Sequence, residues 1–248
     1  MLRALCNEIL FGIRRLGPRW RWQAYSESLE LSFEQDFFEQ SLAKRLRSES
    51  LALNCFYLSL FNSNREHLRS GPGLWLDVGA LDFRYAPALA KFAQNLGVSS
   101  LRALEADTKR LYQDFFRRRD YAEYFGSLAQ KHFGLTVSYE RANFLNWKTT
   151  EKIVGISCLF PFLFQDLHDG FGLPVSYYSP ERFYEHLMRM SSQVLFFHQG
   201  KLELDESMRL IQNLVGSGAR MITGGPYQET PWLNRKNPVY TLVWKTKD

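Results

Sequence analysis

After residue 73 the chain alternates between short apolar runs and longer stretches in which apolar residues recur every three or four positions. Short apolar runs bounded by turn residues predict buried strands, and the three- and four-residue spacing predicts amphipathic helices. We therefore expect strands at residues 74–79, 100–106, 135–141, 152–160, 193–198, 219–223 and 239–245. We expect helices at residues 86–96, 108–133, 180–191 and 203–215.

The alternation of strands and helices indicates an α/β fold whose sheet is mostly parallel and covered on both faces. The last two strands are joined by residues 224–238, which are polar and rich in proline and glycine. Because parallel neighbours need a longer crossover, usually a helix, these two strands are expected to run antiparallel. The sequence thus predicts a Rossmann-like, mostly parallel seven-stranded sheet with an antiparallel last strand.

The part of the chain before residue 71 has a different pattern. Residues 1–16 and 33–61 carry apolar residues at helical spacing and show no alternation typical of strands. The change falls at the turn-forming run Ser70-Gly71-Pro72-Gly73. We therefore divide the chain into an N-terminal helical segment, residues 1–70, and a Rossmann-like domain, residues 71–248.

Composition and charge narrow the classes of protein that fit. The formal net charge of +5 permits an anionic partner without requiring one. No apolar run is long enough to cross a membrane, and the N-terminus lacks the apolar core of a signal peptide. Three cysteines, Cys6, Cys55 and Cys158, lie far apart, which argues against a disulfide framework or a structural zinc site. We expect a cytoplasmic protein without a metal site.

Residues 74–89, LWLDVGALDFRYAPAL, place an acid and a glycine at the end of the first predicted strand. A tight turn from strand to helix needs a glycine where the backbone approaches a ligand closely, and Gly79 meets that need. Asp77 lies two residues earlier. An ordinary strand-to-helix turn without a ligand is the alternative interpretation of these two residues.

This segment resembles the first motif of class I S-adenosylmethionine-dependent methyltransferases, a hydrophobic strand that ends in Asp or Glu and continues as x-G-x-G-x-G. Asp77 and Gly79 match that motif, whereas Leu81 and Phe83 stand where the second and third glycines are expected. The resemblance implies that S-adenosylmethionine binds at Asp77, Gly79 and Ala80, with Asp77 facing the amino group of the methionine moiety. It is closest to bacterial methyltransferase-like proteins of unassigned substrate, and it implies that the leading helices cap the substrate side.

Polar residues after the next two predicted strands complete the cofactor site that the resemblance implies. Glu105 ends the second strand, and its carboxylate is expected to accept both ribose hydroxyls. Asn143 and Phe144 follow the third strand, where the family places a polar residue on the adenine amino group and an apolar residue on the ring. Asp107 is a substitute for Glu105, although an acid at a helix start is also favoured by the helix dipole.

Three aromatic residues lie at the end of the fourth predicted strand or just after it: Phe160, Phe162 and Phe164. They are expected to line a hydrophobic substrate mouth or to pack the core. The segment LFPF keeps one proline and one aromatic residue of the motif that nucleic-acid base methyltransferases carry here, but it lacks the polar residue. This departure argues against base methylation through that motif.

Two histidines are candidates for chemistry. His198 ends the fifth predicted strand and is expected to point into the ligand crevice as a general base, with a buried, hydrogen-bonded histidine as the alternative. His168 lies between Asp166 and Asp169 in the segment QDLHDG, which is expected to be a solvated turn and not a metal site.

The predicted function is an S-adenosylmethionine-dependent methyltransferase that acts on a small, partly apolar acceptor. Two other classes stay open. A non-catalytic module with a degenerate cofactor site is favoured by Leu81, and a nicotinamide-dependent oxidoreductase is disfavoured by the antiparallel strand pair. A nucleic acid or an anionic surface is an alternative partner through the basic N-terminal residues Arg14, Arg15, Arg19 and Arg21.

Overall fold

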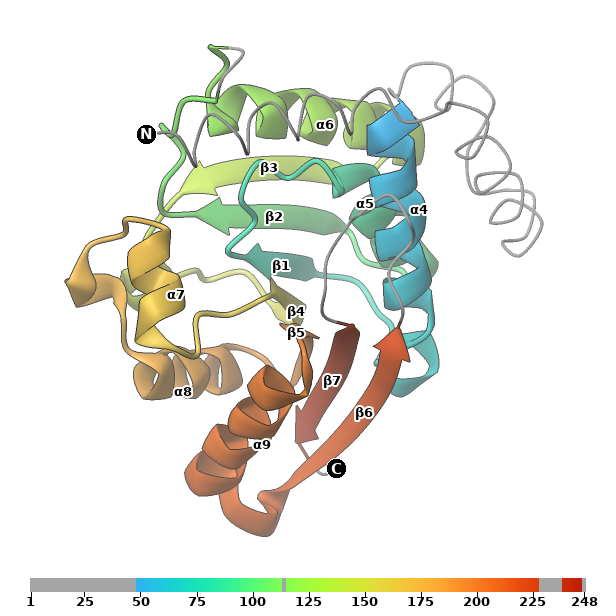
Figure 1. Cartoon of the computed structure of the whole chain (residues 1–248). Helices are drawn as coiled ribbons and strands as arrows, with labels where there is room; N and C mark the ends of the chain where they lie inside the picture. Colours follow the sequence, from blue (N-terminus) through green and yellow to red (C-terminus); the bar gives the residue numbers. More distant parts are fainter. Residues whose placement is uncertain (1–47, 113–114, 228–237, 247–248) are drawn as a thin grey trace.

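The computed structural model describes residues 48–112, 115–227 and 238–246 (Figure 1). The predicted helix at residues 1–16 and the first part of the one at residues 33–61 lie outside the described residues. The same holds for the basic residues Arg14, Arg15, Arg19 and Arg21. The described residues form one sheet with helices on both faces.

Seven strands form the sheet, in the order β3-β2-β1-β4-β5-β7-β6. Their bounds are β1 Leu74–Val78, β2 Ser100–Glu105, β3 Thr136–Arg141, β4 Ile153–Leu159, β5 Gln193–Gln199, β6 Ala219–Tyr227 and β7 Val239–Thr246. The first five strands pair in parallel, and β7 runs antiparallel to both of its neighbours, β5 and β6. The predicted fold class, a mostly parallel seven-stranded sheet with an antiparallel last strand, is confirmed.

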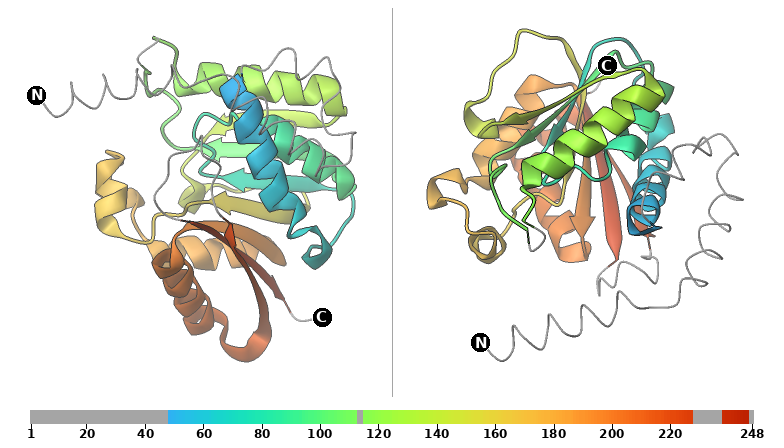
Figure 2. Two further views of the ribbon diagram at one scale, coloured as in Figure 1. Left: turned by 45° about the vertical axis from the view of Figure 1, so that its right-hand side comes forward. Right: turned by 90° about the horizontal axis from the view of Figure 1, so that it is seen from above.

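The helices form a layer on each face of the sheet, as the right-hand view of Figure 2 shows. One layer contains α4 (Ser48–Asn62), α5 (Ala86–Asn95) and α6 (Arg118–Phe133), and the other contains α8 (Pro180–Met190) and α9 (Lys201–Val215). The short helix α7 (Gln165–Gly170) lies beyond the carboxyl ends of the central strands (Figure 1). In the described part of the chain, no helix has both the length and the apolar character needed to cross a membrane.

The largest difference from the predicted elements lies between β2 and α6. The sequence predicts one helix over residues 108–133, but the helix begins only at residue 118. The residues before it fold back on themselves, with a β-bridge between Leu111 and Arg117. The Asp120 carboxylate accepts a hydrogen bond from the Arg117 N–H at 2.6 Å, and such a bond fixes a helix start because it satisfies a free backbone donor. Apolar residues in the turn recur at helical spacing, so the pattern alone does not separate the two structures.

The helix α4 is the described part of the predicted N-terminal segment, and it shares the core of the Rossmann-like domain. Its Phe61 stacks on Phe92 of α5 with ring centroids 5.1 Å apart. Its buried Asn54 donates to the Arg84 carbonyl at 2.9 Å and accepts from the Ala88 N–H at 3.0 Å. The Asn54 side chain therefore links α4 to the start of α5 and to the end of the turn that follows β1.

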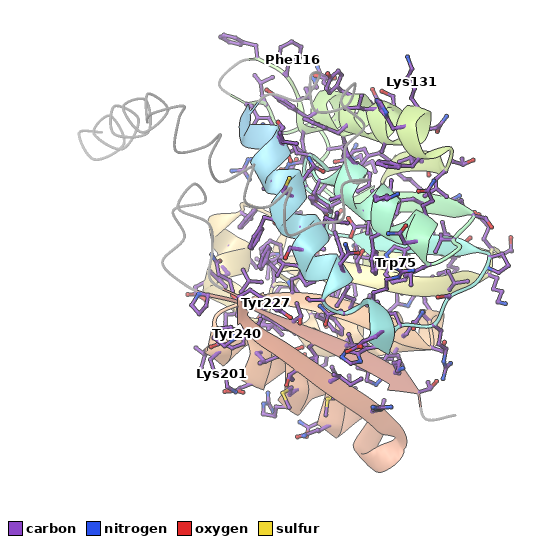
Figure 3. The ribbon with its side chains drawn as sticks, turned by 90° about the vertical axis from the view of Figure 1, so that its right-hand side faces the viewer. Trp75, Phe116, Lys131, Lys201, Tyr227 and Tyr240 are labelled. Atoms are coloured by element: carbon purple, nitrogen blue, oxygen red, sulfur yellow. The ribbon has the colours of Figure 1, made fainter. Side chains whose placement is uncertain are left out.

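A glycine in the central sheet is required by the large side chain beside it. Gly155 in β4 pairs with Trp75 in β1, whose indole is fully buried (Figure 3). A Cβ on Gly155 would overlap the Trp75 ring. Gly155→Ala is therefore expected to lower the free energy of unfolding by about 1–3 kcal/mol, the usual cost of overpacking, as measured by urea denaturation.

A second glycine provides the control for this prediction. A Cβ on Gly126 in α6 would lie 3.5 Å from Val137, an ordinary contact. Gly126→Ala is expected to leave the stability unchanged or to raise it by about 0.5–1 kcal/mol, since glycine is unfavourable inside a helix. Equal losses from both substitutions would contradict the assignment of the cost to the Trp75 contact.

Candidate functional site

A cavity of about 250 Å³ opens at the carboxyl ends of β1, β2 and β4. Residues 160–180, which include α7, form a cap over it (Figure 1). The strand order reverses between β1 and β4, and ligands of parallel α/β sheets bind outside the carboxyl ends of the strands at such a point. The volume is slightly below the range of about 300–1,000 Å³ common for small-molecule sites.

The turn after β1 has the backbone conformation of a glycine-rich loop, although two of the three expected glycines are replaced by other residues. Gly79, Leu81 and Phe83 all have left-handed φ angles, of +76°, +50° and +51°. This conformation costs a non-glycine residue about 1–2 kcal/mol, so the surroundings must hold it in place. The Leu81 N–H donates to Glu105 Oε2 at 2.9 Å, and the Leu81 carbonyl accepts from the Tyr139 hydroxyl at 2.6 Å.

The same turn leaves free space at Gly79. A Cβ at this position would meet no atom within 4 Å, and Gly79 lines the cavity. Leu81 also lines the cavity, whereas Phe83 is buried in the core against the rings of Tyr85 and Tyr139. Both residues replace glycines of the motif. Leu81 therefore narrows the cavity, and Phe83 fills the core.

The strain at Leu81 gives a testable expectation. Leu81→Gly relieves the left-handed strain but adds the conformational entropy of glycine to the unfolded chain, so the stability is expected to stay equal or rise, within about 1 kcal/mol. Phe83→Gly relieves the same strain but removes a buried ring, and it is expected to destabilise the protein. Urea denaturation of the two variants checks the difference, and a clear loss of stability in Leu81→Gly would count against strain at this position.

Glu105, at the end of β2, is buried and accepts three hydrogen bonds from the protein. Its Oε2 accepts from the Leu81 N–H at 2.9 Å, and its Oε1 accepts from the Asp107 N–H at 2.8 Å and from Arg118 Nη1 at 3.1 Å. A carboxylate has about four acceptor positions, so one position is left on Oε2. Glu105 lines the cavity. The sequence predicts that it accepts hydrogen bonds from two ribose hydroxyls, but this arrangement leaves one acceptor position.

Asp77 is fully buried and is not among the residues that line the cavity. Its Oδ1 accepts from the Ser157 hydroxyl at 2.5 Å and its Oδ2 from the Tyr85 hydroxyl at 2.6 Å. Burial raises the pKa of Asp77 to about 6, against the lowering effect of these two hydrogen bonds. The predicted contact between Asp77 and a methionine amino group stays a prediction, and both carboxylate oxygens already have protein partners.

Asn143 and Phe144 both line the cavity beyond β3. Asn143 precedes a short 3-10 helix, and its Oδ1 accepts from the Leu145 N–H at 3.1 Å. This bond leaves the side-chain NH2 group of Asn143 outside the turn's own hydrogen bonding. Phe144 is buried, with its ring edge-on to Phe183 at 5.3 Å, and the two rings form an apolar wall.

The remaining predicted site residues divide into two groups. Phe160 and Phe162 line the cavity, and Phe160 has a left-handed φ of +56° at the start of the cap. Phe164 packs against the core on the α8 and α9 face, and Ala80 is buried with its N–H bonded to the Leu104 carbonyl at 3.1 Å. Neither Phe164 nor Ala80 lines the cavity.

His198 is fully buried in β5 and does not line the cavity. Its ring stacks on Phe196, and neither ring nitrogen has a hydrogen-bond partner among the described residues. Desolvation by burial lowers the pKa of His198 to about 3. A general base must reach its substrate and be available to take a proton, and this placement supports neither condition.

The cap contains cavity residues that the sequence pattern did not identify. The segment QDLHDG, expected as a solvated turn, forms α7, and its His168 is buried between the rings of Phe162 and Tyr178. The expectation was wrong for His168 because helix formation turns that side chain inward, while Asp166 and Asp169 stay exposed. Further cavity residues without a motif signal are Arg118, Leu173, Tyr177, Gln199 and Glu203.

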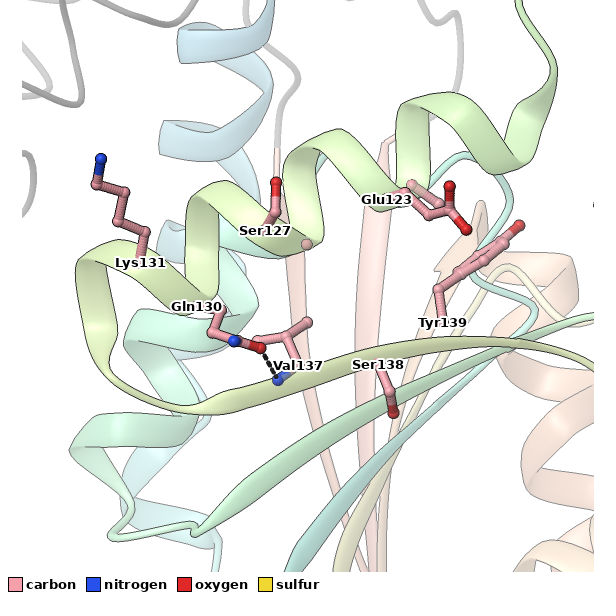
Figure 4. Close-up of a pocket in the computed structure, with 9 residues that line it drawn as sticks. Glu123, Ser127, Gln130, Lys131, Val137, Ser138 and Tyr139 are labelled. Carbon is pink, nitrogen blue, oxygen red and sulfur yellow. Dashed lines mark hydrogen bonds between the residues drawn. The ribbon is translucent and has the colours of Figure 1, made fainter.

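A second hollow, of about 400 Å³, lies between α6 and β3 at the edge of the sheet (Figure 4). Glu123, Ser127 and Lys131 come from the helix side, and the Gln130 side chain accepts from the Val137 N–H at 3.1 Å. None of the predicted site residues lines this hollow. The cavity at the carboxyl ends of the strands is therefore the candidate site.

No family model and no curated protein sequence matches the chain. Solved structures with a similar chain path include the magnesium protoporphyrin IX methyltransferase from Synechocystis with bound SAM, at 11% identity and a TM-score of 0.48 over 85% of this chain and 86% of that one. An S-adenosylmethionine-dependent methyltransferase from Clostridium acetobutylicum has 9% identity and a TM-score of 0.47 over 79% and 92%. TrmK from M. capricolum, in complex with S-adenosylhomocysteine, has 14% identity and a TM-score of 0.45 over 76% and 68%. At these identities the likeness concerns the arrangement of helices and strands.

Proposed function

We propose that the chain is an S-adenosylmethionine-dependent methyltransferase that acts on a small, partly apolar acceptor. The observation that carries the proposal is the turn after β1. Its left-handed backbone leaves free space at Gly79 beside the cavity, and Leu81 is tied to the acid that ends β2. A strained turn held by several bonds at the mouth of a cavity is expected where function requires that backbone shape.

The cavity residues match the successive parts of the cofactor, from methionine through ribose to adenine, in the order in which they occur along the chain. Gly79 offers backbone at close range for the methionine portion, and the remaining acceptor position of Glu105 suits one ribose hydroxyl. Phe144 and Phe183 provide an apolar wall for the adenine ring, with the amide of Asn143 beside it. When bound, S-adenosylmethionine would supply an electrophilic methyl group. The chain's own contribution would be to bind, to orient and to exclude water.

The other part of the cavity supports a partly apolar acceptor. Aromatic and aliphatic side chains from the cap line it, with few polar groups: Phe160, Phe162, Leu167, Phe171, Leu173, Tyr177 and Tyr178. Such a lining favours burial of an apolar body, and the hydroxyls of Tyr177 and Ser179, which also line the cavity, provide a few polar contacts to orient it. The LFPF segment at the start of the cap lacks a polar residue, which supports an acceptor other than a nucleic-acid base.

Two glycines with nearly the same backbone conformation test the proposed cofactor site. Gly79 and Gly97 have φ angles of +76° and +71°, and a Cβ on either meets no atom within 4 Å, but only Gly79 lines the cavity. Calorimetric titration of the wild type with S-adenosylmethionine and S-adenosylhomocysteine is expected to show binding. Gly79→Ala is expected to weaken it by about tenfold or more, a difference of at least about 1.4 kcal/mol.

Gly97→Ala provides the matched control, since it introduces the same backbone strain away from the cavity. Both variants are expected to lose about 1–2 kcal/mol of stability, while Gly97→Ala keeps wild-type affinity. Absence of binding by the folded wild type would overturn the proposed function. Equal weakening in both variants would show that stability, and not contact with the ligand, sets the affinity.

A further inference from the structure

His168, in the cap over the cavity, is a buried histidine with one ring nitrogen that has no protein partner. The residue is 1% exposed and lines the cavity. Its Nε2 has no hydrogen-bond partner among the described residues. An unpaired polar atom is unfavourable in the interior of a protein, so one that lies beside a ligand cavity indicates that a ligand pairs with it.

The surroundings of the imidazole ring decide which of its two nitrogens faces inward. The rings of Phe162 and Tyr178 flank it, with centroids 5.6 Å and 5.4 Å from its own. The His168 Nδ1 lies 3.5 Å from Oδ1 of Asp169, whose side chain is half exposed. The two nitrogens point to opposite sides of an imidazole, so Nε2 lies at the end of the ring that faces away from this exposed carboxylate.

The Asp169 carboxylate also favours one form of the neutral imidazole. An ionised carboxylate only accepts hydrogen bonds, so it favours the tautomer of His168 that carries its proton on Nδ1. In that tautomer Nε2 has a lone pair and accepts a hydrogen bond, so the group that suits it is a donor. A metal ion fits less well, because the described ranges contain no group of three or more His, Cys, Asp or Glu side chains that could hold one.

We infer that His168 Nε2 binds the hydroxyl group of a phenol in the cavity. The side chains around it suit an aromatic body, because Phe162 also contacts Phe171, with ring centroids 4.9 Å apart, and both rings and Tyr178 line the cavity. A neutral hydroxyl enters such a lining at a lower desolvation cost than a charged ammonium group does. The hydroxyl hydrogen satisfies Nε2, and the ring of the phenol fills the apolar part of the cavity.

The chemistry at this atom rests on the proposed methyltransferase function, whereas the binding of the hydroxyl does not. A hydroxyl is a weak nucleophile until a base within hydrogen-bond reach takes its proton. The hydroxyl oxygen forms a bond to the methyl carbon, the bond from that carbon to sulfur breaks with its electron pair left on sulfur, and the hydroxyl proton moves to His168 Nε2. The imidazolium that results faces the Asp169 carboxylate through Nδ1. His168 would thus act as the base that was predicted at His198.

Two probes of similar shape test the hydroxyl site without any cofactor. Para-cresol donates a hydrogen bond, and its methyl ether does not. In calorimetric titrations the wild type is expected to bind para-cresol about tenfold more tightly than the ether. His168→Phe keeps a ring between Phe162 and Tyr178 but removes both nitrogens, and it is expected to lose this preference. His198→Phe removes another buried histidine with unpartnered nitrogens, outside the cavity, and as the matched control it is expected to keep the preference.

A second variant separates binding of the hydroxyl from removal of its proton. His168→Gln keeps a hydrogen-bond acceptor but is no base, so it is expected to retain the preference for para-cresol. Transfer of a labelled methyl group from S-adenosylmethionine to para-cresol is expected in the wild type. In His168→Gln the kcat of this transfer is expected to fall by about a hundredfold or more, with little change in KM.

Several results would overturn the inference. They are no binding of para-cresol, equal affinity of the wild type for both probes, a preference that survives in His168→Phe, or one that is lost in His198→Phe. Tighter binding of benzylamine than of para-cresol would assign the cavity to an amine. Equal transfer rates in the wild type and His168→Gln, or no transfer by a wild type that binds both reactants, would remove His168 from the reaction. No affinity for S-adenosylmethionine beside the expected preference for para-cresol would overturn the proposed function and leave the hydroxyl site standing.

Discussion

Replacing Glu105 by alanine is expected to lower the free energy of unfolding by about 3–5 kcal/mol, the usual cost of breaking a buried ion pair by removing one partner. The Glu105 carboxylate and the Arg118 guanidinium are 3.1 Å apart, and both side chains are almost completely buried. Removal of the carboxylate leaves the Arg118 charge without its main partner in a region of low dielectric constant. It also leaves the Leu81 and Asp107 N–H groups without acceptors.

An exposed ion pair on α6, the helix that carries Arg118, supplies the control for this prediction. Arg119 and Glu123 pair at 2.5 Å, but both side chains are more than half exposed. Glu123→Ala is expected to change the stability by less than about 1 kcal/mol, since solvent screens such pairs. Urea denaturation of the two variants, at one pH and one salt concentration, compares them. Similar small losses would show that Glu105 does not hold the turn after β1 in the way the hydrogen bonds indicate.

The structure changes what a substitution at Glu105 can reveal about the cofactor. From the sequence, this residue looks like a ligand contact whose removal affects binding alone. Its three protein donors show that it also stabilises the fold, so a loss of affinity in Glu105→Ala would not identify a ribose contact. Glu105→Gln keeps an acceptor oxygen for the Leu81 N–H. The same oxygen carries the remaining acceptor position, so a folded Glu105→Gln protein is expected to keep S-adenosylhomocysteine affinity, and a loss of affinity in Glu105→Ala that Glu105→Gln does not share is the sharper evidence.

The pattern of apolar runs was sufficient to predict the sheet. The run at residues 74–78 is buried at every position, as expected for a central parallel strand covered on both faces, and the polar link after β6 indicated the antiparallel pair. The pattern failed between β2 and α6, because apolar residues spaced by four fit both a helix and a turn that leaves such residues exposed. The difference lies in hydrogen bonds such as that between Asp120 and Arg117, which spacing alone does not fix.

Residues of the candidate site were predictable from the last residue of a strand onward, but Asp77 and His198, one position earlier in β1 and β5, do not line the cavity. Gly79, Glu105, Asn143 and Phe144 reach the cavity because the carboxyl ends of parallel strands meet at one edge of the sheet. The position of Asn54 on α4, whose amide holds the turn through the Arg84 carbonyl, has no signal in the sequence. Such a contact depends on how a helix packs, and helical spacing identifies a buried face without identifying the partner across it.

Acid is expected to destabilise the wild type through His198. Burial lowers the pKa of His198 in the folded protein to about 3, from an ordinary value of 6.5. Above pH 6.5 the imidazole is neutral in both states, and as the pH falls below that value the unfolded chain binds a proton that the folded protein excludes. The loss of stability grows until the pH reaches the folded pKa, and by about pH 4 it amounts to about 3 kcal/mol.

The buried carboxyl group of Asp77 has the opposite effect over nearly the same range. Burial raises its pKa to about 6 from 3.8, so as the pH falls through 6 the folded protein takes up a proton before the unfolded chain does. This gain reaches about 2 kcal/mol by about pH 4 and offsets much of the His198 loss. The pH dependence of the wild type alone therefore does not report on His198, and a variant is needed.

His198→Phe isolates the contribution of the histidine. Phenylalanine keeps an aromatic ring against Phe196 and removes two ring nitrogens that have no partner among the described residues. We expect equal or greater stability than the wild type at about pH 7.5, because an unpaired buried polar group costs about 1–3 kcal/mol. At about pH 4 the advantage over the wild type should be larger by about 3 kcal/mol. Urea denaturation at the two pH values measures this difference. An advantage that does not grow with acid would mean that His198 accepts a proton in the folded protein, as a base open to its surroundings would.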